Sequence, residues 1–382
     1  MSQKSVWAII GAGNGGQSMA GHMALKGFPV RLYDIFPETI DAINAQGGIR
    51  IDGVVEGFGP LELATTDLGR ALCGAEVVVV VAPAVAHATI ARDCAPHLCD
   101  GQVVILHPGA TCGALEFRKT LDDSGCRAGV AVAETNSLIY ACRSARPGQA
   151  SILGIKQDLR VATLPARDNP RVLKLLQQMY PQVAGGKNVL ETSLGNANAV
   201  MHPAPTILNT SLIESRHDWL YYLEGVTPSI GAFVEILDRE RLAIARAFGI
   251  QLTPILEWYR IAYGVQACSL SEAVRRNPAY EKIQGQKQLR TRYLLEDVPA
   301  GLVPMIELGK LSGVDVSGME LIARLAEKLL GEDFFTGGRT LKNLGLDGMS
   351  RKEFDHFIET GEKGRQPAEP PQGRPAEGLA AV

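Results

Sequence analysis

The stretch "VWAIIGAGNGG", residues 6–16, decides the fold. Its first half is apolar and rich in β-formers, which predicts a buried strand over residues 5–10. Its second half holds Gly11, Gly13 and Gly16 in the spacing G-x-G-x-x-G, where a strand turns into a helix. There the first glycine permits a tight turn, the second lets a pyrophosphate approach, and the third lets helix and strand pack closely. The stretch therefore predicts a dinucleotide-binding domain.

The chain that follows continues the alternation of strands and helices. Apolar runs predict further strands over residues 29–34, 76–82, 102–106 and 131–135, with segments of helical spacing between several of them. Alternation with apolar strands is typical of a parallel sheet that helices cover on both faces. We therefore expect an α/β fold with a Rossmann doubly wound parallel sheet over residues 1–186.

From about residue 190 the pattern changes, and long helical segments replace the β-rich runs. The change predicts a separate all-helical domain over residues 187–360. The remaining residues, 361–382, are rich in proline, glycine and charge, which predicts a disordered tail.

Two of the expected helices carry boundary signals. For the first, Thr227 is placed as the N-cap, Pro228 as the first helical residue, and Gly249 just past the end. The second repeats the device with Thr253, Pro254 and Gly264.

Composition narrows the classes of function. Of the 382 residues 46% are hydrophobic and 21% charged, as in an ordinary globular protein. The net charge of −3 comes without a basic block, so neither nucleic acid nor a membrane is expected as a partner. The seven cysteines form no CxxC and no zinc spacing, which favours reduced thiols and no metal site. The chain enters its first strand without a signal peptide, so we expect a cytoplasmic protein.

A carboxylate at the end of the second strand indicates which dinucleotide binds. Asp34 lies 18 residues after Gly16, where an acid can accept hydrogen bonds from both ribose hydroxyls of the adenosine. The same charge repels the extra phosphate of NADP, so NAD is expected as the cofactor and NADP is disfavoured. The alternative is that Asp34 only starts the turn before "IFPE".

Other cofactor contacts are expected at the carboxyl ends of the strands, where open α/β sheets bind ligands. Asn14 and Gly15 belong to the glycine-rich turn itself. Pro83 follows the strand predicted at 76–82, and His107 follows the next one. A histidine beside a proline in such a loop can equally be structural.

A single histidine stands out in the helical half. In "NAVMHPAPTIL", residues 198–208, His202 directly precedes Pro203. A residue before proline is disfavoured in helical angles, so we expect a broken helix that exposes the side chain. Histidine exchanges protons near neutral pH and is the usual general acid–base. The alternative, equally open on residue types alone, is a hydrogen-bonded histidine at a kink.

A histidine acid needs a carboxylate to orient it. Glu296 and Asp297 precede Pro299 at another predicted break, although two acids there are also typical of a solvated turn. Substrate carboxylates require cations, for which the candidates are Arg143, Arg290 and Arg292.

The whole set of motifs resembles the opine dehydrogenases, the family of octopine and nopaline dehydrogenases, over about residues 5–358. The resemblance rests on "GAGNGG", "LHPGATCGALEFRK", "ETNSLIYACRSARPGQ", "NAVMHPAPTILN", "YYLEGVTPSI", "NPAY" and "TRYLLEDVPAGLVP". Taken together these segments are far more specific than any one of them.

The resemblance implies an enzyme that joins an amino acid to a 2-oxo acid and reduces the imine with NAD(P)H in a cleft between two domains. It places the catalytic histidine on His202, its carboxylate on Asp297 rather than Glu296, and the cofactor-clamping arginine on Arg292. Asn198, one helical turn before His202, matches a family asparagine. Asn198, Arg143 and Thr206 are the expected substrate contacts, and a homodimer is expected.

Two other functions stay open on the sequence. One is a reductase of a single carbonyl substrate, such as a ketopantoate reductase or a 3-hydroxyacid dehydrogenase, which needs no amine. The other is an NAD-sensing protein without turnover.

Overall fold

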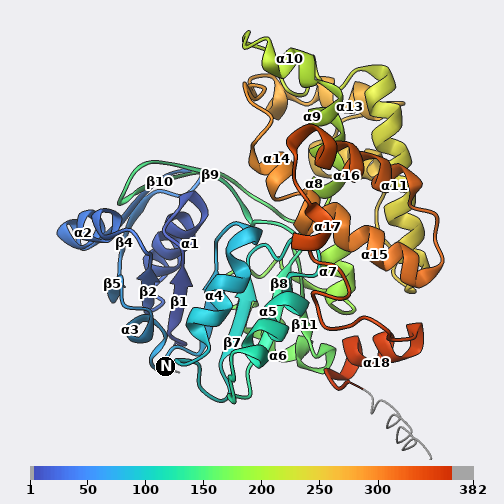
Figure 1. Ribbon diagram of the computed structural model, residues 1–382. Helices are drawn as coiled ribbons and strands as arrows, with labels where there is room; N and C mark the ends of the chain where they lie inside the picture. Colours follow the sequence, from blue (N-terminus) through green and yellow to red (C-terminus); the bar gives the residue numbers. More distant parts are fainter. Residues whose placement is uncertain (1–3, 364–382) are drawn as a thin grey trace, which may run out of the picture.

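The computed structural model describes residues 4–363 and has two parts, an α/β part and a helical part (Figure 1). The α/β part is built on an eight-stranded sheet in the order β12-β11-β8-β7-β6-β1-β2-β5. The predicted Rossmann sheet and its expected strands are confirmed. The strands of this sheet are β1 Trp7–Ile10, β2 Val30–Tyr33, β5 Leu63–Thr65, β6 Val77–Val80, β7 Val103–Leu106, β8 Ala131–Thr135, β11 Arg160–Leu164 and β12 Ala184–Gly185.

One strand of the large sheet that was not predicted runs against its neighbour. β11 runs antiparallel to β8, with Val161 opposite Thr135 and Leu164 opposite Val132. The reason lies in the connection, because a parallel neighbour needs a crossover to the other end of the sheet. The chain instead leaves β8, forms the hairpin of β9 and β10, and returns to the sheet at the same end of the strands, where β8 finished.

A second, four-stranded sheet was not predicted. It has the order β4-β3-β10-β9, and α1 (Asn14–Leu25) packs against all four of its strands as well as against the large sheet. The segments "GIRIDG" and "GFGP" of β3 and β4 lack an apolar pattern, because glycines and charged residues interrupt them. Figure 1 shows β9 and β10 passing over α1. The strands are β3 Gly48–Gly53, β4 Gly57–Pro60, β9 Tyr140–Arg146 and β10 Gln149–Ile155.

Successive residues of the central strands feed two separate cores, as the two-residue period of a strand requires. Trp7 and Ile9 of β1 pack with α1, α2 (Pro37–Gln46) and α6 (Asn169–Gln177). Ala8 and Ile10 belong to a core that also contains α3, α4 and α5 and continues without interruption into the helical part. The two parts are therefore joined by buried apolar surface. The three helices on this face are α3 Leu68–Leu72, α4 His87–Cys94 and α5 Gly113–Asp123.

The helical part begins after β12, and a π-helical turn over Val298–Leu302 separates α14 from α15. Within residues 4–363, no helix has both the length and the apolar character that a membrane crossing needs. The helices are α7 Val189–Leu194, α8 Asn198–Met201, α9 Pro203–Leu208, α10 Thr210–Glu214, α11 Pro228–Ala247, α12 Ile255–Tyr263, α13 Leu270–Arg276, α14 Arg292–Leu295, α15 Val303–Ser312, α16 Ser317–Leu330, α17 Phe334–Gly337 and α18 Arg351–Thr360.

The predicted helix boundaries hold for α11 and differ for α12. Thr227 caps α11 by accepting a hydrogen bond from the amide of Ile230. Before α12 the N-cap is Pro254, not Thr253, and no side chain caps the helix. The carbonyl of Thr253 instead accepts a hydrogen bond from Arg241 of α11, at 3.0 Å.

A buried carboxylate joins the two parts. Glu134, at the carboxyl end of β8, is fully buried and accepts hydrogen bonds from the hydroxyls of Thr192 (2.8 Å) and Ser193 (2.6 Å) on α7. Its other oxygen accepts from the amide of Ala114 at the start of α5, at 2.8 Å. Burial raises the pKa of Glu134, and these donors oppose the rise. Removing either hydroxyl would leave this carboxyl group short of a buried donor.

The C-terminal end of the described chain returns to the α/β part. Asn188, just before α7, donates to Glu359 of α18 at 2.8 Å, and α18 packs against β11. Gly361, the first residue of the predicted tail, ends α18 with a φ of +74°. Of that predicted tail, residues 364–382 lie outside the described part of the chain.

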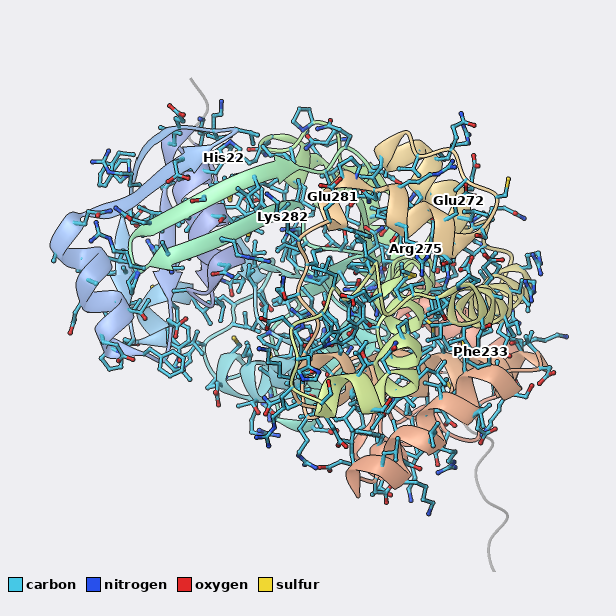
Figure 2. The ribbon with its side chains drawn as sticks, turned by 90° about the horizontal axis from the view of Figure 1, so that it is seen from above. His22, Phe233, Glu272, Arg275, Glu281 and Lys282 are labelled. Carbon is cyan, nitrogen blue, oxygen red and sulfur yellow. The ribbon has the colours of Figure 1, made fainter. Side chains whose placement is uncertain are left out.

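Three buried histidines make stability depend on pH. Burial lowers the pKa of His22, beside β9 and β10 in Figure 2, to about 4. Burial lowers the pKa of His87 and of His107 to about 3, with smaller contributions from Arg339 and Lys156 respectively. Below pH ~6.5 the unfolded chain therefore binds protons that the folded chain does not, so the free energy of unfolding falls as the pH falls.

From pH 7 to pH 5 we expect the free energy of unfolding to fall by about 2 kcal/mol for each of these histidines. Urea titrations at the two pH values measure the loss. His107→Asn should reduce it by one histidine's share, whereas His217→Asn, at an exposed position, should leave it unchanged. Equal stability at both pH values would contradict this interpretation.

Candidate active site

The strand order reverses between β1 and β6, and the carboxyl ends of strands at such a point are where an open α/β sheet binds ligands. Two of the glycines there, Gly11 and Gly16, have no room for side chains. Gly11 has a φ of +104°, and a Cβ on it would lie 2.5 Å from the carbonyl oxygen of Val81. A Cβ on Gly16 would lie 1.8 Å from the carbonyl oxygen of Gly11. The predicted tight turn and close packing of helix on strand are therefore present.

The start of α1 is suited to bind a pyrophosphate. Gly13 is the exposed N-cap, and no acidic residue lies in the first turn. The amides of Asn14, Gly15 and Gly16 precede the first intrahelical bond, which runs from Gln17 to Gly13 at 2.9 Å. Unpaired amides and the positive end of the helix dipole together favour an anion.

Asp34 lies directly after β2 at the same edge. One carboxylate oxygen accepts from the amide of Ala12, inside the glycine-rich turn, and the other accepts from Phe36 at 3.1 Å. Asp34 is thereby held beside the predicted cofactor loop. Pro83, also expected at the cofactor, is exposed and precedes a 3-10 turn over Ala84–Ala86.

In the helical part, two residues 95 positions apart in the sequence meet. His202 lies between α8 and α9, and Asp297 lies between α14 and the π-helical turn. The Nδ1 atom of His202 is 2.7 Å from the Oδ2 atom of Asp297, and both side chains are buried. Within residues 4–363 no group forms a hydrogen bond with Nε2 of His202. This atom is not fully buried.

The backbone at His202 differs from the expectation in two ways. Its angles are helical (φ −100°, ψ −52°), and its exposed fraction is only 8%. Its amide still donates to Asn198 (3.0 Å), and its carbonyl still accepts from Thr206 (3.1 Å). Pro203 lacks an N–H and so removes one hydrogen bond, while the helical path continues around it.

The expected substrate contacts differ in exposure. Asn198 is exposed, one turn before His202. Thr206 is fully buried and donates its hydroxyl to Tyr221 at 3.1 Å, and Tyr221 in turn donates to the carbonyl of His202 at 2.9 Å. Thr206 is therefore connected to the backbone of His202 through the hydroxyl of Tyr221.

Two of the three candidate arginines lie near the pair. Arg143 is exposed on β9 and Arg292 on α14, and both are close enough to act on the pKa of Tyr293. Burial is the largest influence on that pKa and raises it, while the two guanidinium groups oppose the rise. Arg290 instead forms an ion pair with Glu332.

Glu296 is not part of a solvated turn. It is buried, and its carboxylate accepts from the amide of Ala84 at 3.1 Å, so it connects the helical part to the loop after β6. Its other oxygen lies 3.4 Å from the guanidinium of Arg292. The two adjacent acids therefore face different partners.

His107 has a structural role here. Its Nδ1 lies 2.8 Å from the hydroxyl of Thr135, and its Nε2 accepts from the amide of Ile139 at 3.1 Å. Both ring nitrogens are thus occupied.

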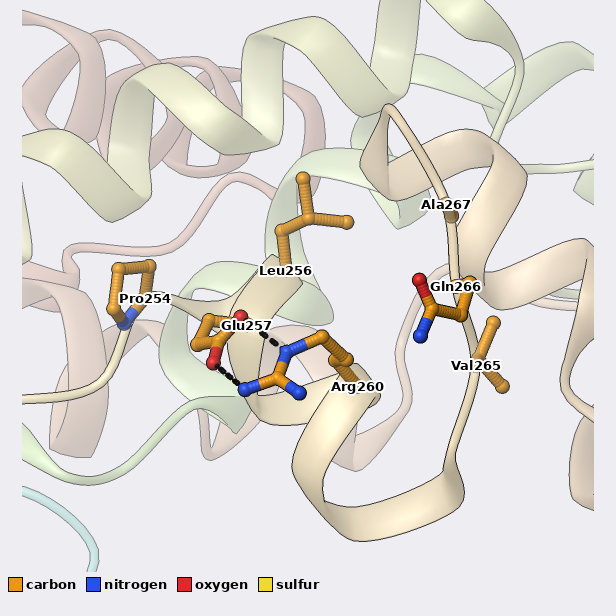
Figure 3. Close-up of a pocket in the computed structure, with 7 residues that line it drawn as sticks. All are labelled: Pro254, Leu256, Glu257, Arg260, Val265, Gln266 and Ala267. Carbon is orange, nitrogen blue, oxygen red and sulfur yellow. Dashed lines mark hydrogen bonds and ion pairs between the residues drawn. The ribbon is translucent and has the colours of Figure 1, made fainter.

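Neither the potential metal ligands nor the cavity beside α12 contributes to this site. No group of three or more potential metal ligands comes together among the described residues. A cavity of about 250 Å³ beside α12 has Glu257 and Arg260 paired across its wall (Figure 3), and none of its lining residues is a predicted site residue.

Sequence reasoning missed two residues of this region. Tyr293 stacks on His202, and its position four residues before Asp297, on one helical face, was an available signal. Arg339 is buried and donates to the carbonyls of Gly109 (2.9 Å) and Ala84 (3.2 Å), in the loops that follow β7 and β6. A lone arginine in "TGGRTL" gives no such signal.

Comparisons with known proteins identify the family. Residues 185–330 match the NAD/NADP octopine/nopaline dehydrogenase alpha-helical domain, and residues 7–116 match the NAD-dependent glycerol-3-phosphate dehydrogenase N-terminus. An opine dehydrogenase of Arthrobacter sp. (strain 1C) is 43% identical over 351 residues, which cover 92% of this chain and 98% of the relative. The chain belongs to the opine dehydrogenase family. Its members are NAD-dependent oxidoreductases that act on CH–NH donors, and NAD is the cofactor.

Solved structures agree on the fold. An octopine dehydrogenase in complex with NADH and agmatine superimposes with a TM-score of 0.80 at 21% identity, covering 95% of this opine dehydrogenase and 100% of that chain. A ketopantoate reductase from Ralstonia eutropha JMP134 gives a TM-score of 0.56 at 20% identity, covering 86% and 100%. Both likenesses concern the fold alone.

The place of Asp34 predicts the choice between the two dinucleotides. NADH should be preferred over NADPH, and Asp34→Ala should narrow the gap by raising the KM for NADH roughly 10-fold or more, because hydrogen bonds to a charged acceptor are lost. Asp34→Asn keeps an acceptor for the turn without the charge and should mainly improve the use of NADPH. Initial rates with each cofactor test this, and equal use of both by the unmodified enzyme would refute it.

Proposed function

We propose that this enzyme condenses a neutral, apolar amino acid with a 2-oxo acid, such as pyruvate, and reduces the imine with NADH in a reversible reaction. The product is a secondary amine with at least two carboxylates, an N-(carboxyalkyl) amino acid. The observation that carries the proposal is the contact of His202 with Asp297, which leaves Nε2 without a hydrogen-bond partner among residues 4–363.

The two parts of the chain would have different roles in the reaction, and their boundary is proposed at Gly186. Residues 1–186 would hold the dinucleotide through Gly11, Gly13, Asn14, Gly15, Gly16, Asp34 and Pro83. The spaces that a Cβ would fill at Gly11 and Gly16, and the unpaired amides of α1, fit such a ligand. Residues 187–360 would supply the acid–base pair and, as the clamp on the cofactor, Arg292, whose exposed side chain lies beside Glu296. When bound, the cofactor supplies the hydride.

His202 would act as the proton donor. A carboxylate only accepts hydrogen bonds, so the Nδ1 atom must donate to Asp297, and the second proton of the imidazolium must lie on Nε2. Asp297 would then hold the ring and stabilise its positive charge. Nε2–H would donate to the carbonyl oxygen of the oxo acid and make the carbonyl carbon more electrophilic.

The remaining steps balance with these residues. The neutral amine attacks the carbonyl carbon, and the former carbonyl oxygen leaves as water after it takes one proton from His202 and one from the amine nitrogen. The nitrogen keeps its other proton, so a protonated imine forms. Hydride addition to the imine carbon then yields the secondary amine. General acid–base help of this kind contributes roughly 10²–10⁴ in rate.

Carboxylate recognition is proposed for Arg143 and Asn198, which are both exposed, with Arg143 near Tyr293 and Asn198 one turn from His202. The bidentate geometry of arginine suits a carboxylate. Thr206 would act on the site through Tyr221, whose hydroxyl contacts both Thr206 and the carbonyl of His202. A homodimer and a cytoplasmic location complete the proposal; sedimentation would give a mass of about twice the 40.9 kDa of one chain.

The alternative of a ketone reductase that needs no amine has a physical test. NADH oxidation should require both a 2-oxo acid and an amino acid, because the reducible species is their imine. A panel of amino acids with pyruvate measures this, and apolar side chains should give the highest kcat/KM. Steady turnover with pyruvate alone, unchanged by any amine, would establish the ketone reductase instead, and no oxidation with any pair would favour the NAD-sensing protein.

Substitution of His202 and Asp297 tests the proposed acid–base pair. His202→Ala and Asp297→Ala should each lower kcat/KM about 10²–10⁴-fold while NADH still binds. The double variant should be scarcely worse than the worse single variant, since the two residues act as one unit. The pH profile of kcat/KM should lose a limb near neutrality without His202. Near-normal turnover of His202→Ala with an unchanged profile would return this residue to the role of a kink histidine.

A further inference from the structure

A tyrosine lies flat against the proposed proton donor. The rings of His202 and Tyr293 have centroids 3.9 Å apart and planes only 9° from parallel. Tyr293 belongs to α14, one residue after Arg292 and one turn before Asp297. The same short segment thus supplies both the carboxylate at the edge of the imidazole and the aromatic ring on its face.

A single hydrogen bond at Nδ1 leaves the imidazole free to tilt about that bond. The stack removes this freedom, because the ring cannot tilt without losing face-to-face contact. Tyr221 adds a third restraint. Its hydroxyl holds the carbonyl of His202 at 2.9 Å, and its ring packs edge-on against Tyr293, with centroids 5.2 Å apart at 71°.

We propose that Tyr293 is a positioning residue for proton transfer, whose ring fixes the plane of the His202 imidazole, directs Nε2 toward the substrate and stabilises the protonated ring. This inference rests on the proposed function of His202. It assigns no proton to Tyr293 itself, whose hydroxyl has no hydrogen-bond partner within residues 4–363.

The charges around the pair are consistent with this role. Asp297 is the acid in contact with the imidazole, and Arg143 of β9 and Arg292 of α14 are the cations near Tyr293. Tyr221 and Tyr222 are further titratable neighbours of Tyr293. Burial raises the pKa of Tyr293 and raises that of Tyr221 well above its ordinary value, so both phenols stay neutral at the working pH. A neutral aromatic face attracts a cation, so the stack favours the protonated form of His202.

The test separates the ring from the hydroxyl. Tyr293→Phe keeps the ring and should retain kcat within about 2-fold, whereas Tyr293→Leu removes it and should lower kcat about 10-fold or more with little change in the KM for NADH. In Tyr293→Leu the alkaline limb of the kcat/KM profile should move about half a pH unit toward lower pH, as loss of a cation–π contact requires. Tyr280→Leu is the matched control, since Tyr280 stacks on Tyr222 at 4.0 Å and not on His202.

Pentafluorophenylalanine at position 293 provides an arm that does not depend on tolerating leucine. It keeps the shape of phenylalanine but reverses the charge distribution of the ring face, so the limb should again move to lower pH relative to Tyr293→Phe. The inference is overturned if Tyr293→Leu or the fluorinated ring leaves the limb in place, if Tyr293→Phe loses as much as Tyr293→Leu, or if Tyr280→Leu matches it. The pH profiles are measured with the oxo acid that the enzyme reduces, whether or not an amine is required. A wild-type enzyme that needs no amine would refute the proposed function, and the profiles of the variants would still test the role of Tyr293.

Discussion

The chemistry proposed for this enzyme depends on one hydrogen bond, between the imidazole of His202 and the carboxylate of Asp297. The bond sets which nitrogen carries a proton in the neutral ring, and so makes Nε2 the atom that can exchange one. It also demands that two short helices, separated by 95 positions in the sequence, meet at a buried point. The proline after His202 and the π-helical turn after Asp297 are the local irregularities that accompany this meeting. Substitutions that leave both residues intact but move either segment should therefore also affect proton transfer.

A second set of buried polar contacts places the helical part, which carries that pair, relative to the α/β part. Glu134 receives two hydroxyl hydrogen bonds from α7, and Arg339 donates to the loops that follow β6 and β7. Glu296 adds a contact to the amide of Ala84. Because a buried charge is costly to leave without its partners, these contacts specify one arrangement of the two parts. The continuous apolar core beneath them contributes attraction but less direction.

The sequence predicts the central strands and the nucleotide turn well, because each apolar strand is buried on both faces and the glycine spacing follows from steric contacts. It predicts the antiparallel β11 and the small sheet poorly, since the direction of a strand depends on its connection, and β3 and β4 owe their place to α1 rather than to their own pattern. His202 and Asp297 were proposed as a pair through the resemblance to the family, because their residue types alone also fit a kink histidine and a solvated turn. The spacing of Tyr293 from Asp297 was a signal for the stack on His202, whereas the buried place of Arg339 follows from tertiary packing, which a lone arginine in the sequence does not indicate.

The most direct test of the central claim is the fate of the hydride. With NADH deuterated at the transferred position, an apolar amino acid and pyruvate, the account predicts a single product by mass spectrometry. That product is a secondary amine dicarboxylate carrying one deuterium on the carbon that was the carbonyl carbon of pyruvate. Formation of deuterated lactate in its place, with the amino acid recovered unchanged, would contradict the account.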